Sequence, residues 1–243
     1  MRQCIALCIA LFGCALSASV HADFRAEFAT VKGDGDYAMT RFELSGTHLR
    51  MDSGKVSMLV DTGKDSFIVL MNDKREYMDL GKMAESMNAM LANVPPQMRE
   101  MMKQRMAAHG SNNLSYASTG QTGEVGGLSC EVYAMTYNSQ HNGDACLASA
   151  TAAGISGADE AALHRAFEQM RAMASKASAG MVHTGIVAMP AGKFPVRITR
   201  YDDGKVAAIS ELKQLSSATA PAGDFAIPAG YNEMQMPAFG APH

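Results

Sequence analysis

Short runs of β-forming residues, each followed by a turn signal, constrain the fold more than any other feature of this sequence. Gly, Asp, Asn and Ser residues fill the gaps between the runs. Because strands this short and this regularly spaced pair with their neighbours in sequence, the pattern predicts an antiparallel meander. The predicted strands cover residues 24–31, 37–44, 49–52, 56–60, 66–71 and 75–80.

The periodicity changes from strand to helix after residue 80. Pro95-Pro96 separates two stretches of helical spacing, because proline ends one helix and can begin the next. The pattern predicts a Met-lined helical hairpin at residues 82–108, inserted into the meander. Its apolar stripes are formed by Met83, Met87, Met90 and Val94 on the first helix, and by Met98, Met101, Met102 and Met106 on the second.

A further helix is predicted for residues 157–177. Ser156 and Asp159 have the spacing of an N-terminal capping pair, and Gly180 fits the end of the helix. The buried face of this helix is expected to carry Leu163, Phe167, Met170 and Ala174.

Strands are expected to resume near Leu114 and to end with a pair at 194–201 and 205–215. The segment from Pro221 onward is rich in Pro, Ala and Gly, and we expect it to be irregular. The whole pattern predicts one α+β domain over residues 23–236, followed by a flexible tail at 237–243.

Residues 1–22 have the pattern of a secretory signal peptide. Arg2 precedes an apolar run that is too short to cross a bilayer comfortably, and Ala22 fits the last position before a cleavage site. No other apolar stretch is long enough to cross a membrane, so we expect a periplasmic or secreted mature chain without a transmembrane helix. A less favoured alternative is lipid attachment at Cys14, because Leu11-Phe12-Gly13-Cys14 resembles a lipobox.

Removal of the signal leaves two of the five cysteines, Cys130 and Cys146. In an oxidising compartment such a pair is most simply a structural disulfide. The β-rich run at 128–137 and the turn dipeptide Asn142-Gly143 predict a hairpin that would bring the two sulfur atoms together. The pair lacks the C-x-x-C spacing that redox or metal-binding thiols favour.

Three segments carry a family resemblance, namely Lys74–Leu80, Gly126–Tyr133 with Cys146 beyond it, and Phe194–Thr199 leading to Asp224–Tyr231. In this order they resemble a secreted bacterial family described only as a domain of unknown function. That family is itself similar to the LolA/LolB-like lipoprotein carriers. The resemblance spans residues 23–236 and implies a curved antiparallel sheet, a half-barrel with helices packed on its concave face. It also implies a concave apolar face that holds an acyl chain or lipid, and no catalytic residues.

The expected function is therefore non-catalytic binding of a lipid, an acyl chain, another apolar ligand or a lipidated partner. The net charge of −3 excludes a nucleic-acid binder held by phosphates, and no cofactor is expected. Nine of the 20 methionines lie between Met71 and Met106. Methionine adapts to varied apolar ligands, so the candidate ligand-binding residues are Met83, Met87, Met90, Met98, Met102 and Met106.

Copper binding is the alternative function for the methionine cluster. Thioether sulfur favours Cu(I), and His109 lies just beyond the hairpin. The spacing of the methionines nevertheless matches an apolar helix face, so no metal site is expected.

Asp61-Thr62-Gly63 resembles the signature of aspartic peptidases, in which two aspartates share one proton. A second triplet, Asp52-Ser53-Gly54, lies nine residues earlier, and a lysine follows each triplet. Peptidases draw their two triplets from separate lobes or subunits, so successive hairpin turns are the favoured interpretation. His48 stands alone at the start of a strand and is expected to be a surface histidine or one whose hydrogen bonds are satisfied.

Overall fold

The computed structural model describes residues 23–92, 94–98, 100–101, 114–176, 189–217 and 220–234. The predicted signal peptide, the tail at 237–243 and much of the second Met-rich helix lie outside these ranges. The described residues form one 12-stranded sheet. Its strands are β1 (Asp23–Lys32), β2 (Tyr37–Ser45), β3 (His48–Ser53), β4 (Val56–Asp61), β5 (Ser66–Met71), β6 (Glu76–Asp79), β7 (Leu114–Val125), β8 (Leu128–Tyr137), β9 (Gln140–Ser149), β10 (Lys193–Asp202), β11 (Lys205–Ser216) and β12 (Asn232–Glu233).

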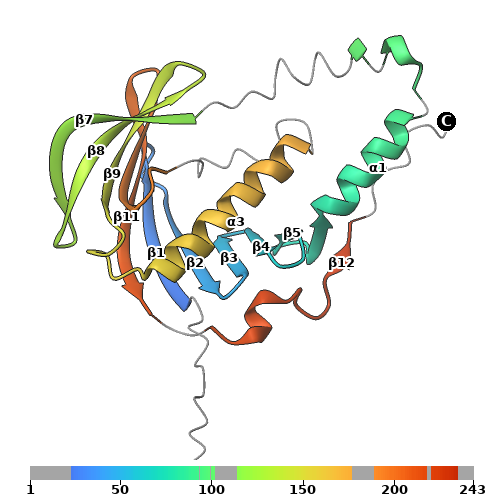
Figure 1. Cartoon of the computed structure of the whole chain (residues 1–243), viewed down its shortest axis with the longest axis horizontal. Helices are drawn as coiled ribbons and strands as arrows, with labels where there is room; N and C mark the ends of the chain where they lie inside the picture. The colour runs from blue at the N-terminus through green and yellow to red at the C-terminus, as the bar shows by residue number, and fades with distance from the viewer. Residues whose placement is uncertain are drawn as a thin grey trace, which may run out of the picture.

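Two meanders meet at β1 in the middle of this sheet. Strands β2 to β6 follow one another on one side of β1, and β11 to β7 lie in reverse order on the other side. All neighbours pair antiparallel except β12, which pairs parallel with β6. The sheet curves strongly and remains open between β7 and β12 (Figure 1). The predicted curved antiparallel sheet of an α+β fold is thus confirmed.

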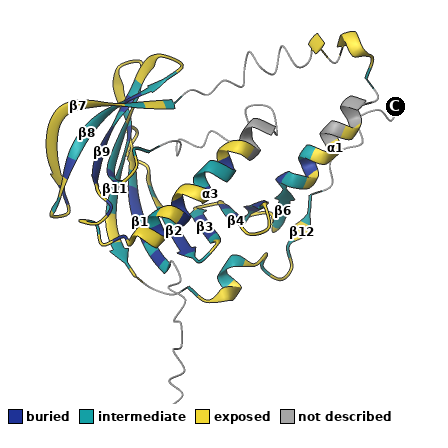
Figure 2. Ribbon diagram, in the orientation of Figure 1, coloured by how far each residue is buried: buried dark blue, intermediate teal, exposed yellow. Residues whose placement is uncertain are grey.

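Helix α3 (Gly157–Lys176) packs across β2, β3 and β4. The predicted cap is present, since the Asp159 backbone N–H donates to Ser156 Oγ at 3.1 Å and Ser156 Oγ donates to the Asp159 carboxylate at 2.6 Å. Buried residues gather where this helix meets the sheet (Figure 2). The main core contains Phe24, Phe28, Leu44, Leu49, Val60 and Phe67 from the strands and Leu163, Ala166 and Met170 from the helix.

Helix α1 (Leu80–Ala92) follows β6 directly. The Asp79 carboxylate caps it by accepting hydrogen bonds from the backbone N–H groups of Gly81 and Lys82 at 2.9 and 3.2 Å. Leu80 and Met83 reach the main core. None of the helices in the described part of the chain is long and apolar enough to cross a membrane.

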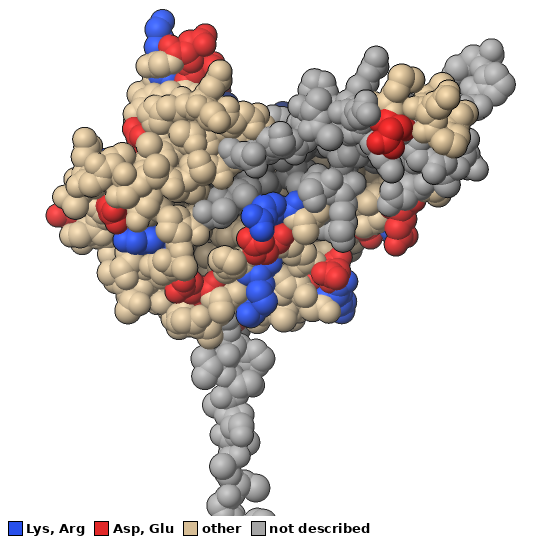
Figure 3. Space-filling model, turned by 45° about the horizontal axis from the view of Figure 1, so that its top comes forward, with Lys and Arg blue, Asp and Glu red and all other residues tan. Residues whose placement is uncertain are grey.

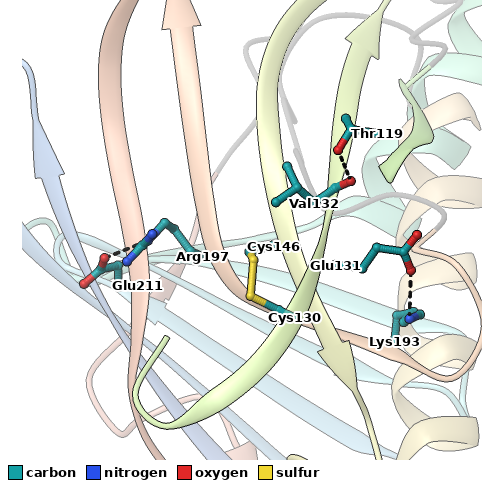
Figure 4. The surroundings of a disulfide bond; sticks show 8 residues. All are labelled: Thr119, Cys130, Glu131, Val132, Cys146, Lys193, Arg197 and Glu211. Atoms are coloured by element: carbon teal, nitrogen blue, oxygen red, sulfur yellow. Dashed lines mark hydrogen bonds and ion pairs between the residues drawn. A yellow bond between two sulfur atoms is a disulfide. The ribbon is translucent and has the colours of Figure 1, made fainter. Parts of the chain in front are cut away.

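Strands β8 and β9 carry the two cysteines, which are bonded to each other in the structure (Figure 4). The turn between these strands is Asn138-Ser139, where both residues have positive φ. The predicted turn at Asn142-Gly143 is wrong, because both residues belong to β9. A Cβ on Gly143 would collide with the Thr199 carbonyl oxygen of the neighbouring strand. Glycine is therefore needed there for close strand packing rather than for a turn.

The C-terminal segment, residues 220–234, is more ordered than the sequence predicts. It contains a 3₁₀ helix over Ala222–Phe225 and the short strand β12. Backbone N–H groups of Asn232 and Met234 donate to carbonyl oxygens of Arg75 and Tyr77 at 2.9 and 2.8 Å. These bonds extend the sheet by one strand beyond β6.

Tyr231 of this segment packs on the sheet face opposite α3. Side chains alternate between the two faces of a strand, so Phe67 of β5 enters the main core while its neighbour Ile68 faces Tyr231. The second apolar cluster consists of Leu59, Ile68, Leu70, Tyr77 and Tyr231. The sheet therefore has apolar cover on both faces near β4 and β5.

Candidate functional site

The methionines predicted to bind ligand lie in different environments. Met83 is buried in the main core and acts as a packing residue. Met98 is more than half exposed beyond α1. Met87 and Met90 belong to α1, whereas Met102 and Met106 lie outside the described residues. The described part of the chain holds no group of three or more His, Cys, Asp or Glu residues that could bind a metal ion.

The two aspartates of the peptidase-like triplets are not brought together. Asp61 pairs across the β3–β4 hairpin with His48, whereas Asp52 pairs with Ser57 near the opposite end of the same hairpin. His48 and Asp52 are four positions apart along β3, which corresponds to about 13 Å. Two carboxylates cannot share a proton over that distance. Both triplets lie at hairpin turns, as the favoured interpretation expects.

Asp61 is instead surrounded by four hydrogen-bond or ion-pair partners. Its Oδ1 accepts from the Gly63 backbone N–H at 2.9 Å and from Thr47 Oγ1 at 3.3 Å. Its Oδ2 lies 3.3 Å from His48 Nε2 and 3.4 Å from Lys64 Nζ. Burial raises the pKa of Asp61, but the Gly63 hydrogen bond and the charges of His48 and Lys64 outweigh it, so the pKa lies below its usual value.

A pocket of about 240 Å³ opens beside this carboxylate, between the sheet and the C-terminal segment. Strands β3, β4 and β5 supply one wall, and Phe225 and Ile227 supply the other. Six of the ten lining residues are apolar. They are Leu49, Leu59, Val60, Ile68, Phe225 and Ile227, and the polar remainder is His48, Asp61, Lys64 and Ser66.

His48, which the sequence predicts to be a surface or satisfied histidine, lines the pocket and has two partners. Its ring lies 5.7 Å from the ring of Phe225, and its Nε2 contacts Asp61. Phe225 and Ile227 were missed as site residues because they belong to a segment predicted to be irregular. The sequence signal that could have revealed them is the Phe225-Ala226-Ile227 run, which places two apolar side chains on one side of an extended chain.

A row of ion pairs crosses β2 and β3 next to the pocket and fastens the C-terminal segment to the sheet. Arg41 lies 3.8 Å from Glu43 and 3.3 Å from Asp52. Arg50 lies 2.8 Å from Asp52, and its Nη1 donates to the Asp224 carbonyl oxygen at 2.6 Å. Acidic and basic side chains also alternate over the face that Figure 3 shows, without a large patch of one sign.

Asp52 should make the stability of the protein sensitive to acid. Burial raises its pKa, but hydrogen bonds from Arg50 and Ser57 outweigh burial and hold the pKa below the usual 3.8. A lowered pKa stabilises the fold above the unfolded-state value, and this contribution is lost as the pH falls through the folded-state value. Between about pH 6 and about pH 3, the free energy of unfolding measured in urea should therefore fall less for Asp52→Asn than for the wild type. The exposed turn variant Asp73→Asn, which should behave like the wild type, is the control.

The fold and the pocket define an α+β domain with an open antiparallel sheet and a small pocket of mixed polar and apolar lining under its C-terminal segment. The chain belongs to the family described as "Domain of unknown function (DUF4412)", whose model matches residues 29–231. The predicted membership of a family of unknown function is thus confirmed. No curated protein matches the chain.

Two solved structures show distant likeness to this chain. A structure of PNGF-II has 8% sequence identity and a TM-score of 0.41, and the match covers 89% of this chain and 31% of that one. The crystal structure of MucB has 12% identity and a TM-score of 0.31, and the match covers 84% of this chain and 56% of that one. The chain thus spans less than two thirds of either protein.

Proposed function

We propose that this protein is a non-catalytic periplasmic binding protein for an apolar ligand, such as a lipid, an acyl chain or the lipid of a modified partner. The observation that carries the proposal is the pocket between the sheet and the C-terminal segment, with apolar lining residues on both walls, among them Leu59, Ile68 and Ile227. Binding sites for small molecules combine mostly apolar walls with a few polar groups. In this proposal the half-barrel is LolA-like and its helices cover the concave face.

The pocket is suited to part of an apolar chain. Its volume of about 240 Å³ lies below the roughly 300–1,000 Å³ of sites that enclose a drug-sized molecule. Leu59 and Ile68 are buried, whereas Ile227 is partly exposed. A ligand would therefore insert one end against the strands and leave the remainder outside.

Two observations support the extracytoplasmic location. Cys130 and Cys146 form a disulfide bond, and disulfide bonds persist mainly in oxidising compartments. Residues 1–22 have the sequence pattern of an export signal. A non-catalytic role fits the environment of Asp61, because its carboxylate oxygens are already engaged by four neighbours.

A charge placed on the apolar wall should weaken the binding of an uncharged apolar probe. Ile227→Asp is expected to weaken the binding of 1-decanol at least about tenfold, because a carboxylate is costly to bury against an apolar chain. Binding can be measured by titration calorimetry, and ¹H–¹⁵N NMR should show shifted backbone signals for Ile68 and Ile227 in the wild type.

Val56→Asp is the matched control for this variant. Val56 and Ile227 are similarly exposed, at 39% and 37%, but Val56 lies at the other end of β4. Its substitution should leave decanol affinity within about twofold of the wild-type value. If the wild type shows no heat of binding and no shifted signals, the proposed function is wrong.

A further inference from the structure

The polar side of the pocket indicates what kind of head group its ligand carries. We propose that the pocket binds single-chain amphiphiles with an anionic head, a carboxylate or a phosphate, and that Lys64 contacts this head. The inference rests on the proposed function and adds the charge of the ligand to it.

The negative charge beside the pocket is shielded from a ligand. The Asp61 side chain is 15% exposed, and both of its oxygens already have partners. A cationic head group would have to displace Lys64 or His48 in order to reach it. Shielded in this way, Asp61 attracts a cation weakly.

The positive charge, in contrast, is accessible. The Lys64 side chain is 79% exposed, and its Nζ lies 3.4 Å from Asp61, which is longer than an ordinary hydrogen bond. Exposed ion pairs of this kind contribute little to stability. Lys64 can therefore turn toward a ligand anion at little cost, and it has three N–H donors to share between Asp61 and that anion.

Ser66 supplies a second donor on the same side. It lies directly opposite Asp61 in the β4–β5 register and lines the pocket. Its hydroxyl has no side-chain hydrogen bond to any residue within the described ranges. A hydroxyl beside an exposed ammonium group suits a carboxylate or phosphate oxygen, which only accepts hydrogen bonds.

The polar lining residues and the buried apolar ones lie in different rows of the strand register. His48, Asp61 and Ser66 are paired in one row, and the exposed Lys64 follows Asp61 in the adjoining turn. Leu59 and Ile68 are buried and are paired two residues further along β4 and β5. A chain that inserts toward Ile68 would therefore leave its head group beside Lys64.

Four probes with the same ten-carbon chain test this assignment by titration calorimetry below their micelle-forming concentrations. Decanoate and decyl phosphate should each bind the wild type about three- to tenfold more tightly than 1-decanol, and decyltrimethylammonium should bind most weakly. Added salt should reduce the preference for the anions, because it screens exposed charges. A preference for only one of the two anions would identify which head group the site accepts.

Lys64→Met should remove most of the preference for decanoate while leaving 1-decanol affinity within about twofold of the wild-type value. Lys55→Met is the matched control, since Lys55 follows the equivalent Asp52-Ser53-Gly54 turn at the far end of the same hairpin. It should retain the full preference.

The outcomes separate this inference from the function on which it rests. Equal binding of decanol and decanoate, or a preference that survives Lys64→Met, would overturn the anionic assignment and leave apolar binding intact. If none of the four probes bound the wild type, both proposals would fail together.

Discussion

A variant with alanine at both Cys130 and Cys146 is expected to unfold with a free energy about 3 kcal/mol lower than that of the wild type. The bond joins residues 16 apart in sequence. Closing a loop of that size lowers the conformational entropy of the unfolded chain, which stabilises the folded state by about this amount. Both cysteines are buried in a small apolar cluster with Val125, Ala148 and Val196, so the native state also loses packing. Urea unfolding followed by circular dichroism measures the difference.

Reduction of the wild type gives an independent measurement of the same effect. A thiol reductant in the unfolding buffer should lower the stability of the wild type toward that of the double variant and leave the double variant unchanged. A wild-type unfolding curve that does not move after complete reduction would contradict the prediction. If the loss is as large as expected, the fold depends on an oxidising compartment, which agrees with the proposed location.

The strands of the first meander could be predicted because their signals are local. Each turn between β1 and β6 contains glycine, aspartate or asparagine, and the adjacent runs are β-forming, so the observed strands begin and end within a few residues of the predicted ones. Helix α3 was predictable for the same reason, since Ser156 and Asp159 mark its start. Local signals failed at Asn142-Gly143, where contact with β10 requires the glycine.

The pocket could not be predicted because distant segments create it. His48 reaches Asp61 through the register of two strands, and Phe225 reaches His48 because Asn232 and Arg50 fasten the C-terminal segment to the sheet. None of these contacts has a periodic signature. The apolar spacing of the methionines did predict α1, and in the structure Met83 packs in the main core.

Replacing Phe67 by alanine is expected to lower the free energy of unfolding by about 3–5 kcal/mol, the usual cost of truncating a fully buried phenylalanine. Phe67 of β5 is completely buried among the other residues of the main core. Phe67 itself does not line the pocket, because its side chain lies on the sheet face opposite Ile68. The folded fraction of Phe67→Ala should therefore bind 1-decanol within about twofold of the wild-type affinity, measured by calorimetry under conditions where the variant is folded.

Ile68→Ala, one residue further along β5, is the natural comparison. Ile68 is also buried, so its truncation should cost about 2–5 kcal/mol of stability. Unlike Phe67, however, it lines the pocket, and its loss should weaken decanol binding several-fold. Two neighbouring variants would then lose similar stability while only one loses binding. A parallel loss of affinity in both would show that binding follows global stability, whereas the divergent result would place the ligand on the face covered by the C-terminal segment.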